Sequence, residues 1–331
     1  MEIKASEVAK LRQMTGAGMM DCKKALVQAE GDFERAKEII REKGKLVAAK
    51  RADRETTEGA VIAKVSGDKA ILVCLGCETD FVSKNAEFQA LAEAIAEAAI
   101  ASFPADVEAL KACVLADGRT VEAAVTEQTG KTGEKHVIVA YETLQAPFIT
   151  SYIHKINGKL GAIVGFNKPV EEQVAKGIAM QVASMNPVAV SAESVPQEVI
   201  DNELKAATEK TKEELVKKAV DAALSKAGIN PAHVDSEAHI ESNTAKGWLT
   251  PEQADQAREI IKTVSEEKAA NLPEQMVANI AKGRLQKFFK EQTLEEQGYQ
   301  MLDGKTPVKD VLKSSDKEAK ILSFKRISLA D

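Results

Sequence analysis

Hydrophobic residues recur every three or four positions over the first 45 residues, the spacing of one buried helix face. Glycines separate three such stretches, which end at Gly16-Ala17-Gly18, at Gly31 and at Gly44. Ser6 can cap the first stretch and Asp32 the third. Because three short amphipathic helices can bury one small common core, the pattern predicts a compact helical module. The charged residues that follow are expected to extend the third helix or to act as a linker.

The period changes to that of β-strands after this charged stretch. Residues 60–65 and 69–77 are β-rich, and Gly67-Asp68 between them is a two-residue hairpin signal. Residues 71–75 are apolar throughout, which is typical of a strand covered on both faces. The sequence therefore predicts a β-hairpin whose second strand is fully buried.

Helices and strands alternate from here to residue 196. Asn85 can cap a helix, and two more helices are expected between residues 106 and 130. Three further strands and a helix are predicted at residues 137–144, 149–156, 160–167 and 170–184. The pattern indicates an α+β core built from two similar parts.

Residues 197–272 are almost purely helical in pattern and highly charged. Apolar stripes at helical spacing run over residues 200–215 and 254–264, and Thr250-Pro251 is a strong start for the second helix. Two long helices joined by an irregular segment predict an antiparallel, coiled-coil-like hairpin that projects from the core.

The last residues return to a core-like pattern, with a helix expected at 273–290 and a strand at 321–327. We therefore divide the chain into four parts: a helical module with its linker, two core subdomains and an inserted hairpin. Their expected boundaries are residues 1–55, 56–145, 146–196 together with 273–331, and 197–272.

Composition limits the classes of function. A chain of 331 residues with 44% apolar and 29% charged residues is typical of a globular protein with two or three domains. Its formal net charge of −6 argues against a body that neutralises nucleic-acid phosphates. It has no signal-peptide core and no apolar run of about 18 residues. We expect a soluble, cytoplasmic protein with reduced thiols that binds neither nucleic acid directly nor membrane.

The sequence lacks the usual signals for catalysis and cofactor binding. Gly130-Lys131-Thr132 and Gly304-Lys305-Thr306 look like the end of a phosphate-binding loop, but neither has the glycine required five positions before its Gly-Lys pair. Cys74 and Cys77 lie in an apolar strand, as core thiols do more often than zinc ligands. The four histidines do not cluster with other ligands. We therefore expect no catalytic residues, no metal and no cofactor.

Residues 78–82, Glu-Thr-Asp-Phe-Val, place a carboxylate beside a bulky aromatic where a buried strand leads into a helix. Such a connection is expected to be an exposed loop. Phe81 can fold back as a staple onto Phe88 or Leu91 of that helix. It can also act as an aromatic wedge for a pocket on a partner. The residues alone favour the staple and leave the wedge open.

Two long motifs occur in the order and spacing of a single family. The first is Leu11-Arg12 with residues 15–26, Thr-Gly-Ala-Gly-Met-Met-Asp-Cys-Lys-Lys-Ala-Leu, and the second is residues 77–82. With further matches at residues 151–154 and 283–288, they resemble the elongation factor Ts family, exchange factors for the GTPase elongation factor Tu. The resemblance covers about residues 1–196 and 276–327.

The resemblance implies that the N-terminal helices form a ubiquitin-associated-type module that docks on the nucleotide domain of elongation factor Tu. The partner-binding positions that it implies are Leu11, Arg12, Gly18, Met19, Met20 and, toward the third domain of the GTPase, His154. It further implies that a wedge dislodges magnesium from the GTPase, so that GDP is exchanged for GTP. The wedge positions that match the family are Thr79, Asp80, Phe81 and Val82.

The sequence departs from the family pattern in three places. The insertion at 197–272 is longer than in the best-known members, and Gly298-Tyr299 stands where the family usually has Pro-Phe. Some members carry a further C-terminal helical module, and the contacts that depend on it stay open for this chain. An alternative function is a helical-hairpin adaptor or scaffold for another protein, and a thiol enzyme using Cys74 and Cys77 is a third. Homodimer formation stays open.

Overall fold

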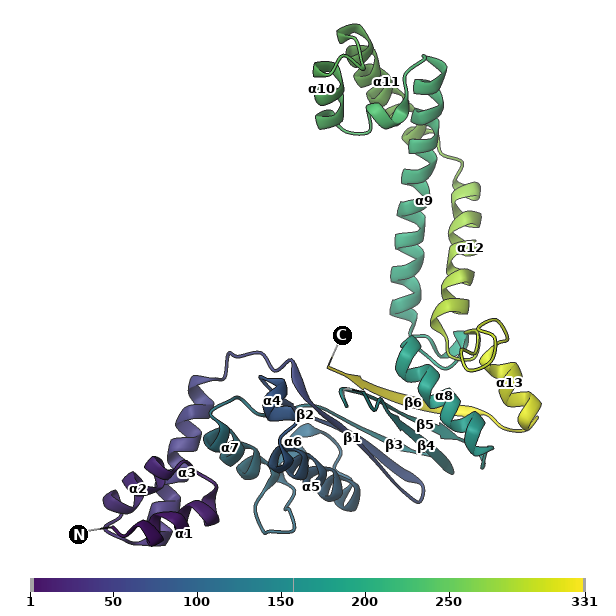
Figure 1. Cartoon of the computed structure of the whole chain (residues 1–331). Helices are drawn as coiled ribbons and strands as arrows, with labels where there is room; N and C mark the ends of the chain where they lie inside the picture. The colour runs from purple at the N-terminus through teal and green to yellow at the C-terminus, as the bar shows by residue number, and fades with distance from the viewer. Residues whose placement is uncertain (1–2, 157, 330–331) are drawn as a thin grey trace. The chain divides into compact units, whose positions relative to one another are not determined.

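The computed structural model describes residues 3–156 and 158–329 (Figure 1). Its contacts divide the chain into two compact units. One comprises Met1–Val190 and Gln297–Asp331, and the other comprises Ser191–Glu296.

The first three helices share one small core. They are α1 (Ala5–Thr15), α2 (Met19–Gln28) and α3 (Phe33–Lys50). Gly16 ends α1 in the left-handed conformation at φ +67°, and the Asp32 carboxylate accepts the N–H groups of Glu34 and Arg35 at the start of α3. Ser6 does not cap α1 as predicted, because α1 already begins at Ala5 and Lys4 is at the N-cap position. The core residues are Val8, Leu11, Ala17, Cys22, Ala25, Leu26, Ala29 and Ala36.

Gly44 does not end the third helix, contrary to the sequence-based prediction. Helix α3 continues to Lys50, and Gly44 is buried in its interior against α7 (Val121–Thr132). A methyl group added at Gly130 of α7 would lie 2.8 Å from the Gly44 Cα atom. The glycine therefore allows two helix backbones to pack closely, which local helix-stop rules do not anticipate.

Two antiparallel three-stranded sheets form the core of this unit. The first has the order β1-β2-β3 and the second β4-β5-β6. Their strands are β1 (Glu58–Ser66), β2 (Lys69–Cys77), β3 (Val137–Gln145), β4 (Phe148–Ile153), β5 (Leu160–Phe166) and β6 (Ile321–Ser328). Ser66 pairs with Lys69, which confirms the predicted hairpin turn at Gly67-Asp68.

Strand β2 is buried on both faces, as its apolar run predicts. One face, with Ile71 and Val73, packs in a cluster with helix α5 (Ala86–Ser102). The other face, with Leu72, packs in a cluster that also contains Ile163 of the second sheet. The α+β class is confirmed. The remaining helices of this unit are α4 (Asp80–Ser83), α6 (Val107–Ala112), α8 (Glu172–Met185) and α13 (Val308–Ser315).

The second unit is built on the long helix α9 (Gln197–Lys226). Both α11 (Pro251–Ala270) and α12 (Glu274–Gln292) contact α9 and run back along it (Figure 1). We expected the helix at 273–290 to belong to the core, but α12 lies with the hairpin in this unit. The Thr250 capping box at the start of α11 is as predicted.

The connection between α9 and α11 is structured rather than irregular. It contains two short helical segments, η2 (Pro231–His233) and α10 (Glu237–Ala245). Side chains from both ends of the connection and from the long helices bury a small cluster of their own. Its residues are Val220, Leu224, Ile229, Val234, Ile240, Leu249, Ala254 and Ala257, and we call this region the hairpin tip.

Candidate functional site

The candidate wedge, residues 79–82, follows the buried strand β2. Residues 80–82 lie in the single helical turn α4, with Thr79 directly before it, rather than in the loop expected from the sequence. Phe81 is 85% exposed on this turn, whereas Phe88 of the next helix is fully buried. Phe81 therefore does not fold back as a staple, and its ring is open to solvent.

The other residues of α4 have different environments. Val82 packs against the core cluster that contains Phe88, so its side chain anchors the turn instead of facing outward. Asp80 forms an ion pair with Lys84 at 2.7 Å. The hydrogen bond from the Lys84 ammonium lowers the pKa of the Asp80 carboxyl, which is therefore ionised at neutral pH. The exposed end of α4 thus presents an aromatic ring beside a carboxylate.

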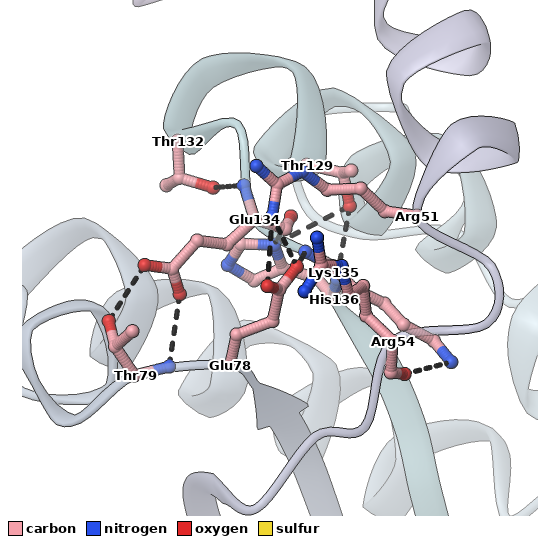
Figure 2. A network of polar contacts seen from close by, with 9 residues as sticks. All are labelled: Arg51, Arg54, Glu78, Thr79, Thr129, Thr132, Glu134, Lys135 and His136. Atoms are coloured by element: carbon pink, nitrogen blue, oxygen red, sulfur yellow. Dashed lines mark hydrogen bonds and ion pairs between the residues drawn. The ribbon is translucent and has the colours of Figure 1, made fainter.

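Thr79, the residue before α4, is held by Glu134 from the α7–β3 connection. The Glu134 carboxylate accepts the Thr79 backbone N–H at 3.1 Å and the Thr79 hydroxyl at 2.7 Å (Figure 2). Thr79 stands at the N-cap of α4, yet its side chain makes no capping hydrogen bond to the helix. Its hydroxyl acts as a donor to Glu134 instead of as the usual acceptor.

Glu78 lies beside this contact and joins two further segments. Arg51, which follows α3, reaches the two Glu78 carboxylate oxygens at 2.9 and 2.8 Å, and the Lys135 backbone N–H donates to the same carboxylate at 2.6 Å. Burial alone would raise the pKa of Glu78, but the Lys135 and Arg51 hydrogen bonds lower it. The Lys135 ammonium also donates to the Ala52 carbonyl and to the Arg54 carbonyl, the second of which Figure 2 shows.

His136 closes the inner side of this network. Its Nδ1 atom lies 2.9 Å from the Glu134 carbonyl oxygen, which fits an N–H donor at that position, and its ring centroid is 5.6 Å from that of Phe88. Its backbone N–H donates to the Thr129 hydroxyl at 3.2 Å. Burial lowers the pKa of His136, so the ring is neutral at neutral pH. A neutral, buried ring therefore supports the connection that carries Glu134.

The N-terminal module places the predicted docking residues in different environments. Met19 and Met20 are 49% and 64% exposed at the start of α2, next to exposed Gly18. Arg12 is also exposed. Leu11 is fully buried in the module core, so it cannot contact a partner while the module is folded. Its role is to hold the helices that carry the other four.

His154 follows β4, which ends at Ile153 instead of continuing to residue 156 as predicted. Its Nδ1 atom lies 2.9 Å from the Tyr152 hydroxyl, and its ring is only partly exposed. The predicted site residues thus lie on three separate elements: the α1–α2 region, α4 and the turn after β4.

Sequence reasoning missed the residues that hold the wedge. Arg51 lies 27 positions from Glu78, Glu134 lies 55 positions from Thr79, and Lys135 lies 57 positions from Glu78. No local spacing signals such contacts, because they arise only when the α7–β3 connection folds against the end of β2. Of these supporting residues, Glu78 alone lies inside a recognised motif, and the residues next to it in the sequence do not predict its hydrogen-bond partners.

Three further observations concern the reactivity of the thiols, metal binding and membrane-spanning helices. Burial raises the pKa values of Cys74 and Cys77 to about 12, which is unfavourable for a thiolate nucleophile. Within residues 3–156 and 158–329, no group of three or more His, Cys, Asp or Glu side chains could hold a metal ion. No helix in the same ranges is long and apolar enough to cross a membrane.

Comparisons with known proteins identify the family of this chain. The family model described as Elongation factor TS matches residues 78–331. Proteins named Elongation factor Ts from Phocaeicola vulgatus and Bacteroides fragilis are 52% and 53% identical over 329 residues, covering 99% of this chain and 99% of each relative. A protein of the same name from Christiangramia forsetii is 41% identical over 332 residues, again covering 99% of both chains. The chain therefore belongs to the elongation factor Ts family.

Proposed function

We propose that this protein is a guanine-nucleotide exchange factor that binds elongation factor Tu in its GDP form and promotes release of GDP. Family membership supports elongation factor Tu as the partner. The observation that carries the proposal is Phe81, an aromatic side chain that is 85% exposed on a turn held by distant residues.

An exposed aromatic ring on a fixed element suits a binding hot spot. Burying a phenylalanine side chain in a pocket on the partner would recover about 2–3 kcal/mol of hydrophobic free energy. Val82 packs against the core and the Thr79 hydroxyl donates to Glu134, so the turn is already fixed. Little conformational entropy is therefore lost when Phe81 inserts. The wedge is therefore preorganised for insertion.

Insertion beside the metal site of the GTPase would release GDP without covalent chemistry. Mg²⁺ requires near-ideal octahedral geometry and bridges the nucleotide phosphates to the GTPase. A wedge that moves the neighbouring backbone by about 1 Å spoils this geometry, and GDP loses its main charge partner. Exchange factor and nucleotide then weaken each other's binding by the same free energy.

The exposed residues of the N-terminal module are proposed as a separate docking surface. Met19 and Met20 offer flexible apolar side chains that adapt to a partner, Arg12 lies on α1, and Gly18 directly precedes α2. His154, oriented by the Tyr152 hydroxyl, is proposed as a contact for the third domain of the GTPase. Docking at these positions would hold the wedge at the nucleotide site.

Release of fluorescent GDP from purified elongation factor Tu tests the proposal. Phe81→Ala should lower the rate of release by roughly 30-fold or more, which corresponds to about 2–4 kcal/mol of coupling. Val114→Ala is the matched control, since the Val114 side chain is also exposed, at 60%, and lies in the same subdomain. An unchanged rate for Phe81→Ala, with the native circular dichroism retained, would exclude the wedge.

The hairpin tip gives the adaptor alternative its one specific observation. Trp248 is 62% exposed there. If the protein were an adaptor that binds through this residue, adding the full-length chain would not change the rate of GDP release from elongation factor Tu. The same assay on the wild-type chain therefore separates the two functions.

A further inference from the structure

We infer that Glu134 is a positioning residue for the wedge: by accepting two hydrogen bonds from Thr79, it fixes the direction in which α4 presents Phe81. The inference rests on the proposed exchange function and adds to it a residue that lies outside the wedge. Glu134 belongs to the connection between α7 and β3, 55 positions away in the sequence.

Helix α4 cannot hold its own shape. It has four residues, and a single helical turn fixes many dihedral angles for few hydrogen bonds. The backbone bonds that close it are Ser83 N–H to Thr79 O and Lys84 N–H to Asp80 O, both 3.1 Å long. Contacts from outside the turn must therefore define its direction.

Glu134 supplies such a contact at the first residue. Its two carboxylate oxygens accept the Thr79 N–H and the Thr79 hydroxyl, one each. Hydrogen bonds to an ionised acceptor are stronger than those between neutral groups, and two of them to one residue fix orientation as well as position. Val82 anchors the turn from the other side through the core. Phe81 lies between these two fixed points.

Glu134 is itself held on a rigid base. Gly133 ends α7 in the left-handed conformation at φ +74°, and the Glu134 N–H then donates to the Thr132 hydroxyl at 3.1 Å. The Glu134 carbonyl oxygen faces the Nδ1 atom of buried His136. The carboxylate therefore extends from a defined backbone position, as Figure 2 shows. Its direction is set before any partner binds.

Two pairs of variants separate positioning from general stability. Thr79→Val keeps the backbone N–H and the shape of the side chain but removes the hydroxyl donor, whereas Thr79→Ser restores that donor. Glu134→Gln removes the charge and one of the acceptors, and Glu108→Gln is its control. Glu108 is an exposed glutamate of the same subdomain that pairs with the nearby Lys111. Native circular dichroism checks the fold of each variant.

The first readout is GDP release from elongation factor Tu at increasing factor concentration. Thr79→Val and Glu134→Gln should lower the maximal rate by about tenfold, because small errors in placing a reacting group are costly. The half-saturating concentration should change less than about twofold, since the proposed docking residues Met19 and Met20 are untouched. Thr79→Ser should recover most of the rate that Thr79→Val loses, and Glu108→Gln should stay near the wild-type rate. Equal rates for Thr79→Val and Thr79→Ser would overturn the inference.

The second readout does not depend on exchange activity. In the free protein, amide hydrogen exchange over residues 78–85 should accelerate in Thr79→Val and Glu134→Gln but not in Glu108→Gln. Unchanged protection in both variants would overturn the inference whatever the exchange assay gives. If protection falls as expected while Phe81→Ala releases GDP at the wild-type rate, the positioning role stands and the proposed function fails.

Discussion

Two exposed aromatic residues, Phe81 and Trp248, are held in opposite ways. Phe81 depends on residues from distant parts of the sequence, through contacts that span 27 to 57 positions. Trp248 depends on residues near it in the sequence. Its backbone N–H donates to the Asn243 carbonyl at 2.9 Å, and the Asn243 side-chain amide donates to the carbonyl of His233, 10 positions away. The tip is a local structure, whereas the wedge exists only when the whole core subdomain is folded.

The difference teaches how each surface can be changed. A local structure can be lost, lengthened or exchanged without disturbing the fold around it, because few contacts cross its boundary. A surface held by long-range hydrogen bonds is sensitive to changes at residues that never touch the partner. We therefore expect the wedge to be fragile to substitutions in its support and the tip to be independent of exchange.

The largest expected effect comes from comparing Phe81→Ala with Trp248→Ala. The first should slow GDP release by roughly 30-fold or more because a hot spot is lost. The second should leave the rate within about twofold and the fold intact, since Trp248 packs on solvent-exposed partners such as Lys246, whose Nζ lies 5.3 Å from the ring centroid. Stopped-flow measurement with labelled GDP compares them directly. A loss of rate in Trp248→Ala would make the tip part of the exchange machinery.

The sequence predicted elements whose signals are local. The buried strand β2 follows from its unbroken apolar run, and the caps at Asp32 and Thr250 follow from side chains that can reach nearby N–H groups. The sequence did not predict the length of α3, because Gly44 serves a close contact with Gly130 that lies 86 positions away in the chain.

The candidate site was predicted in part, for a related reason. The motif at residues 77–82 identified the wedge residues, but only the structure distinguishes exposed Phe81 from anchoring Val82. Leu11, within a recognised motif, is buried, since a motif records both binding residues and the core residues that support them. The small core of the tip was missed because it joins residues of α9 and α11 to single apolar residues of the connection between them, and no local period predicts that pairing.

The next effect compares two buried leucines. Leu26 lies in the core of the N-terminal module and Leu224 in the core of the hairpin tip, and both are nearly inaccessible. Replacing either with Ala should destabilise its own region by about 2–5 kcal/mol. Trp248 is the one tryptophan of the chain and lies in the tip, so its fluorescence reports on that region.

Thermal unfolding followed by this fluorescence should show a lower midpoint for Leu224→Ala and little change for Leu26→Ala. In the exchange assay the pattern should reverse, with weaker binding to elongation factor Tu for Leu26→Ala only. Coupled changes in both assays for either variant would mean that the two regions do not unfold independently.

A smaller effect is expected from deleting the tip in one piece. Replacing residues 219–258 with a short Gly/Ser loop removes the entire apolar cluster from Val220 to Ala257. Replacing only residues 230–248 would remove Val234 and Ile240 and uncover the apolar residues of the cluster that remain, which should promote aggregation. We expect the larger deletion to remain monodisperse in light scattering and to retain most exchange activity. Collapse of activity with a native core would show that the tip contributes to exchange.

The smallest effect is a pH dependence from His136. Burial holds the pKa of the folded-state ring below its ordinary value of 6.5. As the pH falls below this value, the unfolded chain binds a proton that the folded chain does not, so stability is present above about pH 6.5 and is lost toward pH 5. The groups that face the ring include the Glu134 carbonyl, the Thr129 hydroxyl, Phe88 and the carboxylates of Glu78 and Glu134. The two carboxylates raise the pKa of His136 and limit the loss of stability.

His136→Asn removes the titration while keeping an N–H donor near the Glu134 carbonyl. The melting temperature of the wild type should therefore fall more steeply than that of His136→Asn between pH 7 and about pH 5. Parallel curves for the wild type and His136→Asn would show that the buried ring makes no contribution to acid sensitivity.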